Sequence, residues 1–504
     1  MPRSRSVVAA LILLFAQAAA GDCLTPSWEL IPTLPPAGSF RPTMVVDDFD
    51  GDGIADTILV RSHVTGDTAT FQRGRGNGFF AAPVDIYIAT QAGIHGPRGL
   101  YHALARDLNR DGKLDLLLLE NLTRLVYLPG NGDGTFADPL FSPMKIGGVF
   151  AIAELTGDDI DDVVAFHYDT GFGVVIFAGT ATGTFAEWTR IPLPASPNAI
   201  ATGDLDGDGA NDIVAGYGEP SNLALLFGND DGTFDPAVPL VNDGVNGDSW
   251  AVTIELADLE NDGDLDIVAE NFFDLLAVHR NRGGRIFDEV TIYPVPQNFS
   301  SVKHQIHSAV ADVTGDGKLD LVATTGDMVV TRRGLGDGTF DTPHFDLFPA
   351  SGLNTESIDT TDFDGDGRVD VIIGQNHHGP RTLRNRCGDA NVFLTANPPS
   401  PFLPGQSVTV QVAGYADDFL QPPPVDATGT VSILEGPTVL ATGTLSNGQV
   451  TLTVPGLTPG AHKLVARYSG DDQYQPAESA RIIVRVTSGP AVSPPPPPRR
   501  RAVR

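Results

Sequence analysis

The sequence contains a nine-residue acidic segment that is typical of a cation-binding loop. It is clearest at 362–370, DFDGDGRVD, where carboxylates stand at positions 1, 3, 5 and 9 and glycine at position 6. Four carboxylates in nine residues repel one another unless a cation lies among them, and hard oxygen ligands suit Ca2+. Glycine permits the positive φ of a sharp turn around a metal. The β-branched residues at 371–373 predict that a strand leaves the loop.

A lone acidic, glycine-rich turn is weak evidence for a metal, but this chain holds seven such loops. We number them loops 1 to 7 and count positions 1 to 9 within each. They begin 47 to 59 residues apart, a period typical of solenoids, propellers and arrays. The first residues of the loops are Asp48, Asp107, Glu154, Asp204, Asp258, Asp312 and Asp362.

Each repeat has the same order of short strands around its loop. In the fourth repeat an apolar strand enters the loop at 199–201, a second leaves it at 213–215, and a third follows at 223–227. A glycine turn ending in phenylalanine and then an outer strand complete the repeat. Four antiparallel strands per repeat predict a propeller blade. We expect the turn phenylalanines to pack in the core; they are Phe136, Phe185, Phe234 and Phe340.

The last repeat lacks its outer strand, and the beginning of the chain supplies a match for it. The outer strand of the sixth repeat is TPHFDLFP at 342–349, and 25–32 is the similar TPSWELIP. In this alignment Cys23 and Cys387, the two cysteines of the chain, fall on opposite sides of one strand-to-strand turn. Since export permits oxidation, we predict a disulfide that locks a closed ring. The alternative is two separate buried thiols.

Residues 1–20 are typical of a secretory signal peptide. Arg3 and Arg5 precede an apolar run over 7–16, and 18–20 is a small-residue cleavage site. No later stretch has transmembrane length. We therefore expect an exported protein, secreted or held at the cell surface or in the periplasm, without a transmembrane segment.

The strong negative charge is explained largely by the loops. The formal net charge is −31, and positions 1, 3, 5 and 9 of the seven loops hold 25 of the 63 acidic residues. Much of the acidity is therefore accounted for by metal ligation. A surface of this charge argues against nucleic acid as a partner.

The loops, the Gly-Thr-Phe turns and the repeat period together resemble the FG-GAP or VCBS repeats of secreted bacterial proteins and of integrin α-chain propellers. The resemblance covers 21–388. It implies an all-β fold, a seven-bladed β-propeller whose N-terminal strand completes blade seven. Each loop would join the first two strands of a blade and hold Ca2+, giving up to seven ions.

The same resemblance assigns calcium ligands by position. Side-chain oxygens are expected at positions 1, 3, 5 and 9 and a backbone carbonyl at position 7. Loop 3 departs most, with threonine at position 3 and Asp159 where glycine is expected, so we expect its site to be the weakest or empty. The expected ligands are Asp48, Asp50, Asp52, Ile54, Asp56, Asp107, Asn109, Asp111, Lys113, Asp115, Glu154, Thr156, Asp158, Asp162, Asp204, Asp206, Asp208, Ala210, Asp212, Asp258, Glu260, Asp262, Asp264, Asp266, Asp312, Thr314, Asp316, Lys318, Asp320, Asp362, Asp364, Asp366, Arg368 and Asp370.

From residue 389 the sequence changes to alternating strands without acidic loops. Strands are expected at 407–412, 429–434, 449–454, 462–468 and 481–486. Their regular spacing predicts an Ig-like β-sandwich over 389–487. The stretch YSGDDQY at 468–474 resembles bacterial Ig-like repeats. Residues 488–504, rich in Pro and Arg, are expected to be an unstructured tail, and contact with an anionic envelope surface is the alternative.

Side chains at the start of the innermost strands could form a ligand face at one end of the central channel. His102, Trp250, His304 and His307 fall there, although surface or packing roles are the simpler interpretation. No nucleophile elbow, His-Glu-x-x-His, Cys-His pairing or phosphate loop occurs in the sequence.

Three functions follow from these patterns. The first is a non-enzymatic, monomeric, calcium-binding scaffold that serves adhesion or extracellular recognition of an unknown protein or glycan. The second is a carbohydrate-binding lectin that uses one propeller face. The third is a polysaccharide lyase or hydrolase built on a propeller.

Overall fold

The structure is a computed structural model of the whole chain. It describes residues 28–31, 39–62, 67–89, 99–167, 171–217, 222–241, 251–271, 275–295, 307–325, 328–347, 355–375, 380–386, 390–397, 407–414, 427–455, 457–471, 474 and 476–487. The chain divides into two compact units, Leu24–Asn385 and a second that begins at Arg386. No helix within these ranges has the length and hydropathy needed to cross a bilayer.

The first unit is a series of four-stranded antiparallel sheets, and the described residues contain seven of them. Each acidic loop joins the first two strands of one sheet. Numbered by their loops, the sheets are β2 (Ser39–Asp47), β3 (Asp56–Ser62), β4 (Thr68–Gln72) and β5 (Val84–Ile88); β6 (Leu100–Arg106), β7 (Asp115–Glu120), β8 (Arg124–Leu128) and β9 (Leu140–Pro143); β10 (Phe150–Ala153), β11 (Asp162–Phe166), β12 (Gly173–Gly179) and β13 (Phe185–Pro192); β14 (Pro197–Gly203), β15 (Asp212–Tyr217), β16 (Asn222–Leu226) and β17 (Val238–Val241); β18 (Ala251–Ala257), β19 (Asp266–Asn271), β20 (Leu275–His279) and β21 (Thr291–Pro294); β22 (His307–Ala311), β23 (Asp320–Thr325), β24 (Met328–Arg332) and β25 (His344–Leu347); and β26 (Thr355–Thr361), β27 (Asp370–Gln375), β28 (Arg381–Asn385) and β1 (Trp28–Ile31).

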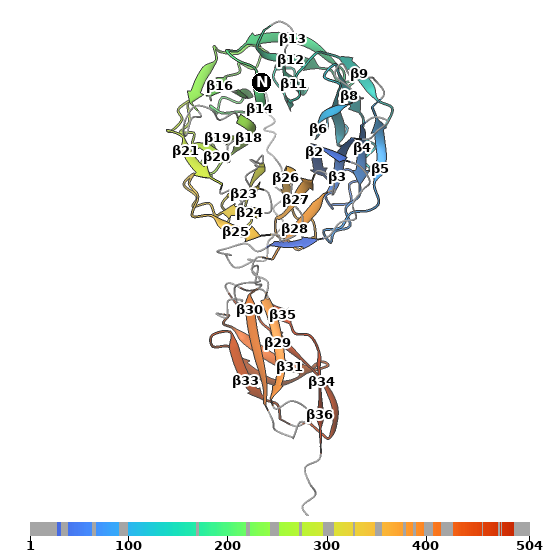
Figure 1. Ribbon diagram of the computed structural model, residues 1–504, viewed down its shortest axis with the longest axis vertical. Helices are drawn as coiled ribbons and strands as arrows, with labels where there is room; N and C mark the ends of the chain where they lie inside the picture. The colour runs from blue at the N-terminus through green and yellow to red at the C-terminus, as the bar shows by residue number, and fades with distance from the viewer. Residues whose placement is uncertain are drawn as a thin grey trace, which may run out of the picture. The chain divides into compact units, whose positions relative to one another are not determined.

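The sheets stand in a ring like propeller blades, with the first strand of each nearest the centre and the fourth at the rim (Figure 1). The first strands of successive sheets are neighbours in space, and β26 of the last sheet is a neighbour of β2 of the first. The strand order and the strand positions therefore confirm the predicted series of blade-like sheets.

The N-terminal strand β1 completes the last sheet. It pairs antiparallel with β28, and Trp28 lies opposite Asn385 in the register. The Trp28 side chain is buried and its Nε1 donates to Thr331 Oγ1 of the preceding sheet (3.4 Å). The match between 25–32 and the outer strand of the sixth repeat thus predicted this pairing correctly. Cys23 and Cys387 lie outside the described residues, so the disulfide stays a prediction.

Apolar cores fill the spaces between neighbouring sheets. The second strand β7 is buried along its whole length, whereas the outer strand β5 is mostly exposed. Each core cluster joins side chains of two adjacent sheets; Val164 and Ile176 of sheet 3, for example, share a cluster with Ile213 of sheet 4. Inner strands that are covered on both faces explain the continuous apolar runs in the sequence.

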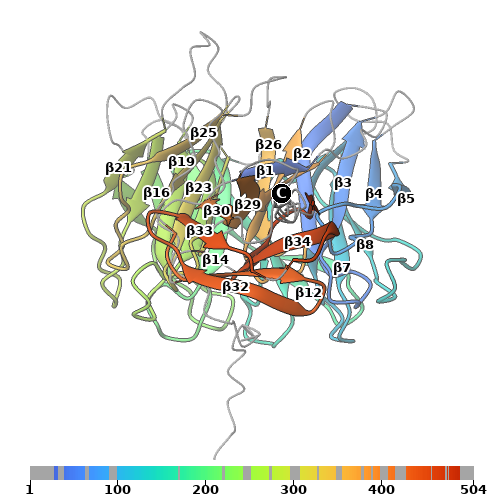
Figure 2. The same ribbon diagram turned by 90° about the horizontal axis from the view of Figure 1, so that it is seen from below.

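The acidic loops all lie at the same end of the ring. Because strands alternate in direction, the loop between the first and second strands lies at the same end as the turn between the third and fourth. We call this second connection the outer turn. Figure 2 shows the strands of this unit side-on, with connections at both ends.

The second unit is an Ig-like sandwich of two antiparallel sheets. One is β29 (Ala390–Asn397), β30 (Ser407–Gly414) and β33 (Gln449–Thr453). The other is β32 (Thr438–Thr444), β31 (Thr430–Glu435), β34 (Gly460–Tyr468) and β35 (Ala477–Glu478), and β36 (Ile482–Val486) pairs with β34. Its core includes Val410, Ile433 and Tyr468. Residues 488–504 lie outside the described ranges.

Candidate metal centres

The aspartate at position 9 of every loop is buried and accepts two backbone hydrogen bonds. In loop 4, Asp212 Oδ2 accepts the amide of Leu205 at position 2, and Oδ1 accepts the amide of Gly228, where the outer turn begins (both 2.8 Å). Burial raises the pKa of Asp212 to about 6, and the two amides oppose the rise. This carboxylate ties the loop to the end of the third strand.

The same two bonds recur in all seven loops. The N···O distances lie between 2.7 and 3.1 Å. The position-9 residues, each 0 or 1% exposed, are Asp56, Asp115, Asp162, Asp212, Asp266, Asp320 and Asp370.

The carboxylate at position 1 gathers the amides of its own loop. In loop 7, Asp362 Oδ1 accepts Gly365 N (2.7 Å) and Oδ2 accepts Gly367 N (2.8 Å). In loop 3, the longer Glu154 accepts the amides of residues 156–158 on Oε1. The first carboxylate thus sets the curvature of the loop without a metal.

Loop 3 keeps the backbone path of the others despite its missing glycine. Asp159 at position 6 has φ 67°, in the left-handed region that Gly209 (φ 91°) occupies in loop 4. A side chain in this region costs about 1 kcal/mol or more. Loop 3 therefore differs from the other loops in its side-chain ligands and not in the path of its backbone.

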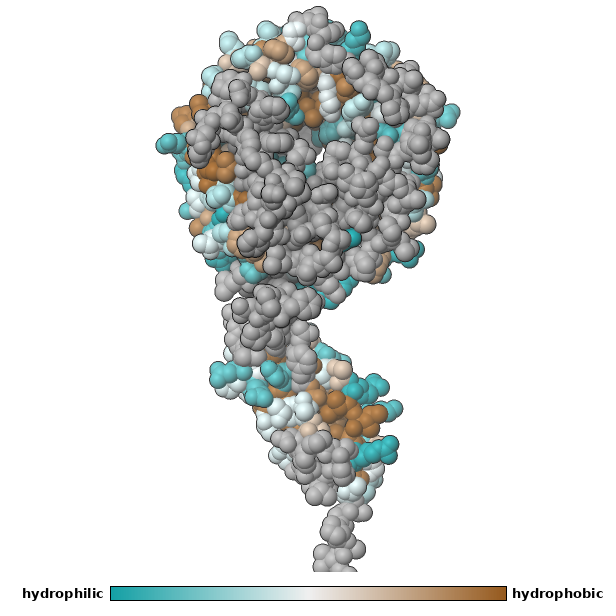
Figure 3. Space-filling view, in the orientation of Figure 1, coloured by the Kyte–Doolittle hydropathy of each residue, from teal (hydrophilic) through white to brown (hydrophobic). Residues whose placement is uncertain are grey.

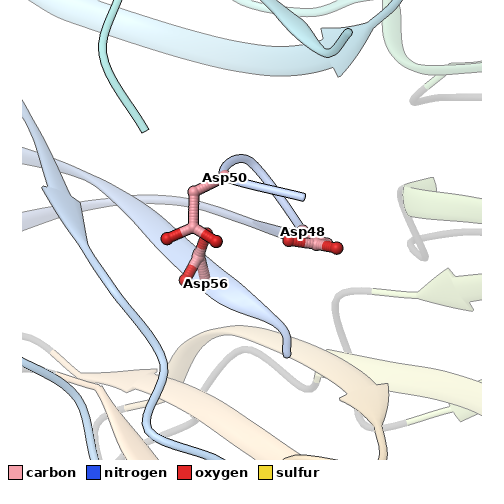
Figure 4. A group of neighbouring side chains, drawn as sticks. All are labelled: Asp48, Asp50 and Asp56. Carbon is pink, nitrogen blue, oxygen red and sulfur yellow. The ribbon is translucent and has the colours of Figure 1, made fainter. Parts of the chain in front are cut away.

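Three loops bring carboxylate oxygens together closely enough to hold one cation. Positions 1, 3 and 9 each offer an oxygen, and these oxygens lie within 4.8 Å of one another. In loop 1, Asp50 and Asp56 lie next to each other while Asp48 stands across the bend (Figure 4). The three groups are Asp48, Asp50 and Asp56; Asp204, Asp206 and Asp212; and Asp362, Asp364 and Asp370.

The position-5 and position-7 residues of these loops are placed differently. The position-5 side chains, Asp52, Asp208 and Asp366, stand outside the three groups. Each accepts the amide of position 7 on its Oδ1, at 2.8–3.0 Å. Their role as ligands therefore stays a prediction, as does that of the position-7 carbonyls.

The other four loops do not form such a group of acidic side chains within the described residues. Loops 2, 3 and 6 have Asn109, Thr156 and Thr314 at position 3. In loop 5, Glu260 lies against Asp266, and burial together with this neighbour raises the pKa of Glu260. A calcium ion in these loops would need oxygens other than three carboxylates.

The position-3 side chains fit a cation because several of their oxygens are buried without a hydrogen-bond donor. These atoms are Thr156 Oγ1, Glu260 Oε2 and Thr314 Oγ1. A buried oxygen without a donor is costly, and a hard cation relieves that cost. The shared position of these atoms in loops 3, 5 and 6 favours a metal.

Loops 1, 4 and 7 also contact the outer turn of the next sheet. Gly134 N of sheet 2 donates to Phe49 O of loop 1 (3.2 Å), and Gly78 N of sheet 1 donates to Phe363 O of loop 7 (3.1 Å). Asn281 Nδ2 of sheet 5 donates to Leu205 O of loop 4 (2.6 Å). All three acceptors stand at position 2. The loops are therefore parts of the junctions between sheets.

The predicted ligand face is described only in part. Trp250 and His304 lie outside the described residues. His102 is the third residue of β6 and His307 the first of β22, so both lie at the end of the ring opposite the loops. His102 packs edge-on against Phe150 (ring centroids 4.8 Å apart), and burial lowers the pKa of each histidine to about 4.

Buried carboxylates of the first and second strands were not singled out in the sequence. Glu270 accepts both the amide and the hydroxyl of Ser308, and Glu255 Oε1 accepts Val310 N (3.2 Å). Burial raises the pKa of Glu255 to about 8, of Glu270 to about 7 and of Asp359 to about 6. Glu255 and Glu270 of sheet 5 thus satisfy amides of β22 in sheet 6.

The ring of blade-like sheets and the acidic loop in each define a repeat protein of the propeller-like class. A family model for the FG-GAP-like repeat matches residues 48–118, 154–215, 204–269 and 312–373. A model for the bacterial Ig-like domain (group 3) matches residues 394–487. The chain therefore contains FG-GAP-like repeats followed by a C-terminal bacterial Ig-like domain. Among curated proteins, none shows significant similarity to it.

Several solved structures are similar in part. One is an Agrocybe aegerita lectin described as recognising non-reducing terminal N-acetylglucosamine (18% identity, TM-score 0.43, 69% of this chain and 85% of that chain). Another is BBS1N in complex with ARL6DN (10%, 0.44, 71% and 96%). A third is a protein from Lactobacillus plantarum (13%, 0.45, 62% and 86%).

Replacement of a position-9 aspartate should destabilise the protein even without metal. In Asp212→Asn, one acceptor becomes an NH2 group that faces a buried backbone N–H. We expect a loss of about 1–3 kcal/mol in the free energy of unfolding, measured by denaturant titration in chelator. Asp208→Asn is the matched control. Asp208 is exposed at position 5 of the same loop, and asparagine keeps the Oδ1 that accepts the amide of Ala210. Equal stability of the two variants would contradict this role.

The buried Glu270 should make the protein less stable as pH rises. Its pKa is raised from 4.5 to about 7 in the folded chain, so the protonated side chain favours the folded state. This contribution to stability is full below about pH 4.5 and is lost as the pH rises to about 7. In Glu270→Gln, the decrease in the free energy of unfolding with pH should be smaller by up to about 3 kcal/mol. The measurement is the free energy of unfolding between pH 5 and 8.5 in saturating calcium. The exposed Glu289→Gln is the control; an identical slope in both variants would rule the effect out.

Proposed function

We propose that the chain is an exported, calcium-binding β-propeller scaffold for adhesion or extracellular recognition. The observation that carries the metal is the convergence of three carboxylates in each of loops 1, 4 and 7. Asp48, Asp50 and Asp56 and their counterparts in the other two loops would hold the ion, whose charge would neutralise the loop.

The seven sheets would then form one closed, seven-bladed propeller. The pairing of β1 with β28 and the proximity of β26 to β2 support this closure. A Cys23–Cys387 disulfide would reinforce the same junction, because both cysteines flank the paired strands in sequence.

The proposed role is non-enzymatic recognition of an extracellular protein or glycan by a monomer. The N-terminal basic and apolar segment supports export, and the acidic residues stand at repeated positions that already have a structural role. Exposed apolar side chains on outer strands, such as Val84, Phe141 and Val238, are 43–59% exposed. Figure 3 shows hydrophobic residues (brown) among hydrophilic ones (teal) around the rim of the ring.

Calcium should raise the thermal stability of the mature chain. Sites of this extracellular type bind at about 10⁻⁴ to 10⁻³ M. Because the ion binds the folded loops and not the unfolded chain, 10 mM calcium should contribute about 1.4–2.7 kcal/mol per filled site. Melting curves in calcium and in chelator measure this contribution, with magnesium as the control. Identical curves in calcium and chelator would refute the metal-binding proposal.

Recognition without turnover should appear in a binding screen of the full chain against glycans and extracellular matrix proteins. We expect a saturable interaction with one class of partner that leaves the partner chemically unchanged. Mass spectrometry of the bound partner after prolonged incubation is the check. Cleavage or elimination products would replace the scaffold proposal with an enzyme.

A further inference from the structure

Within the described residues, every acidic side chain at position 3 of a loop is in contact with an arginine. The carboxylates are 0–10% exposed, so their charges are largely removed from water. The pairs are Asp50 with Arg73, Asp206 with Arg285 (Oδ2 to Nε, 2.6 Å), Glu260 with Arg280 (3.6 Å) and Arg282 (3.5 Å), and Asp364 with Arg384.

Three of these arginines stand at the same place in their sheets, at the end of the third strand or just after it. Arg73 and Arg384 directly precede Gly74 and Asn385, whose amides donate to the position-9 aspartates. Arg280 has the same place in sheet 5. In sheets 2, 3 and 6, where position 3 is neutral, this place is taken by Pro129, Ala178 and Arg333.

Arg333 provides an internal comparison. It stands at the same place in sheet 6 as Arg73 does in sheet 1, but position 3 of loop 6 is Thr314. Its Nε lies 3.8 Å from Asp341 Oδ2, an acidic residue outside the loop. The position alone therefore does not direct the arginine to the loop; the acidic third residue does.

Loop 4 reaches the same arrangement by another route. The residue before Gly228 is Phe227, which cannot neutralise Asp206. Arg285 from the outer turn of sheet 5 lies over the Phe227 ring, 4.3 Å from its centroid, and contacts both Asp206 and Asp235. A different segment of the chain thus supplies the positive charge to the equivalent carboxylate.

We propose that Arg73, Arg285 and Arg384 are internal counter-cations that set the calcium affinity of loops 1, 4 and 7, an inference that rests on the proposed function. Without metal, each arginine neutralises the position-3 carboxylate and preserves the loop. With metal, the same fixed charge lies beside a divalent ion and weakens its binding, because like charges a few ångströms apart repel. These side chains are affinity determinants rather than ligands.

The test compares calcium binding and melting of full-length variants. Arg73→Gln, and the triple variant in which Arg285→Gln and Arg384→Gln are added, should bind calcium about tenfold more tightly, by Coulomb repulsion at an exposed site. Competition with a chromophoric chelator measures the affinity. In chelator these variants should melt at lower temperature than the parent, so calcium should raise their melting temperature more.

Arg333→Gln is the matched control, since it removes the same side chain from a loop with a neutral third position. It should leave the calcium affinity unchanged and shift melting equally with and without calcium. Unchanged or weaker calcium binding in Arg73→Gln, with normal binding by the parent, would overturn this inference alone. A parent chain that binds no calcium at millimolar concentration would instead overturn the proposed function.

Discussion

The hydrogen bonds from two backbone amides to one buried aspartate are the interaction on which each repeat depends. Position 9 lies where the second strand begins, and its carboxylate joins the start of the loop to the end of the third strand. A buried carboxylate that accepts amides remains acceptable inside the sheet without a positive partner. The position-9 aspartate therefore fixes the geometry of the loop. The side chain at position 3 is the one that needs a cation.

Position 3 has no comparable set of amide donors. In loops 1, 4 and 7 its oxygens lie beside the fixed carboxylates of positions 1 and 9, and in loops 3, 5 and 6 a buried position-3 oxygen lacks a hydrogen-bond partner. Arginine contacts these side chains wherever they are acidic. The loop is thus a preformed shell of oxygens whose negative charge is shared between an internal cation and, in the proposed holo form, Ca2+.

The loops also couple neighbouring sheets. The carbonyl at position 2 accepts hydrogen bonds from the outer turn of the next sheet, as with Leu205 and Asn281. A change of charge or order in one loop therefore acts on the junction between two sheets rather than on one sheet alone. At the junction between the last and first sheets, loop 7 belongs to the sheet that β1 completes, and Phe363 O of this loop accepts Gly78 N from the outer turn of sheet 1.

Much of this fold could be predicted from the sequence because its signals are local and repeated. The acidic loops mark the first strand-to-strand connection of every sheet, and the similarity of 25–32 to 342–349 identifies the β1 pairing. Strand β32 was not predicted, since Thr438–Thr444 follows β31 after a two-residue turn and buries no residue fully. Strand β29 was also missed, because it lies at the change between the two units.

The contacts of the site were harder to predict. Arg285 lies 79 residues from Asp206 and belongs to the next sheet, so no spacing within a repeat reveals the pair. Glu270 becomes notable only because the ring brings Ser308 of the next sheet against it. In the sequence, position 9 resembles one more ligand, and only the hydrogen bonds of the folded chain show that both of its oxygens already accept amides.

The most direct measurement is anomalous diffraction from crystals of the mature chain grown with calcium and soaked with a lanthanide. We expect peaks inside loops 1, 4 and 7, each within bonding distance of the carboxylates at positions 1 and 3. Well-ordered loops without a peak in any of the three, and with the arginines still seated on Asp50, Asp206 and Asp364, would contradict it.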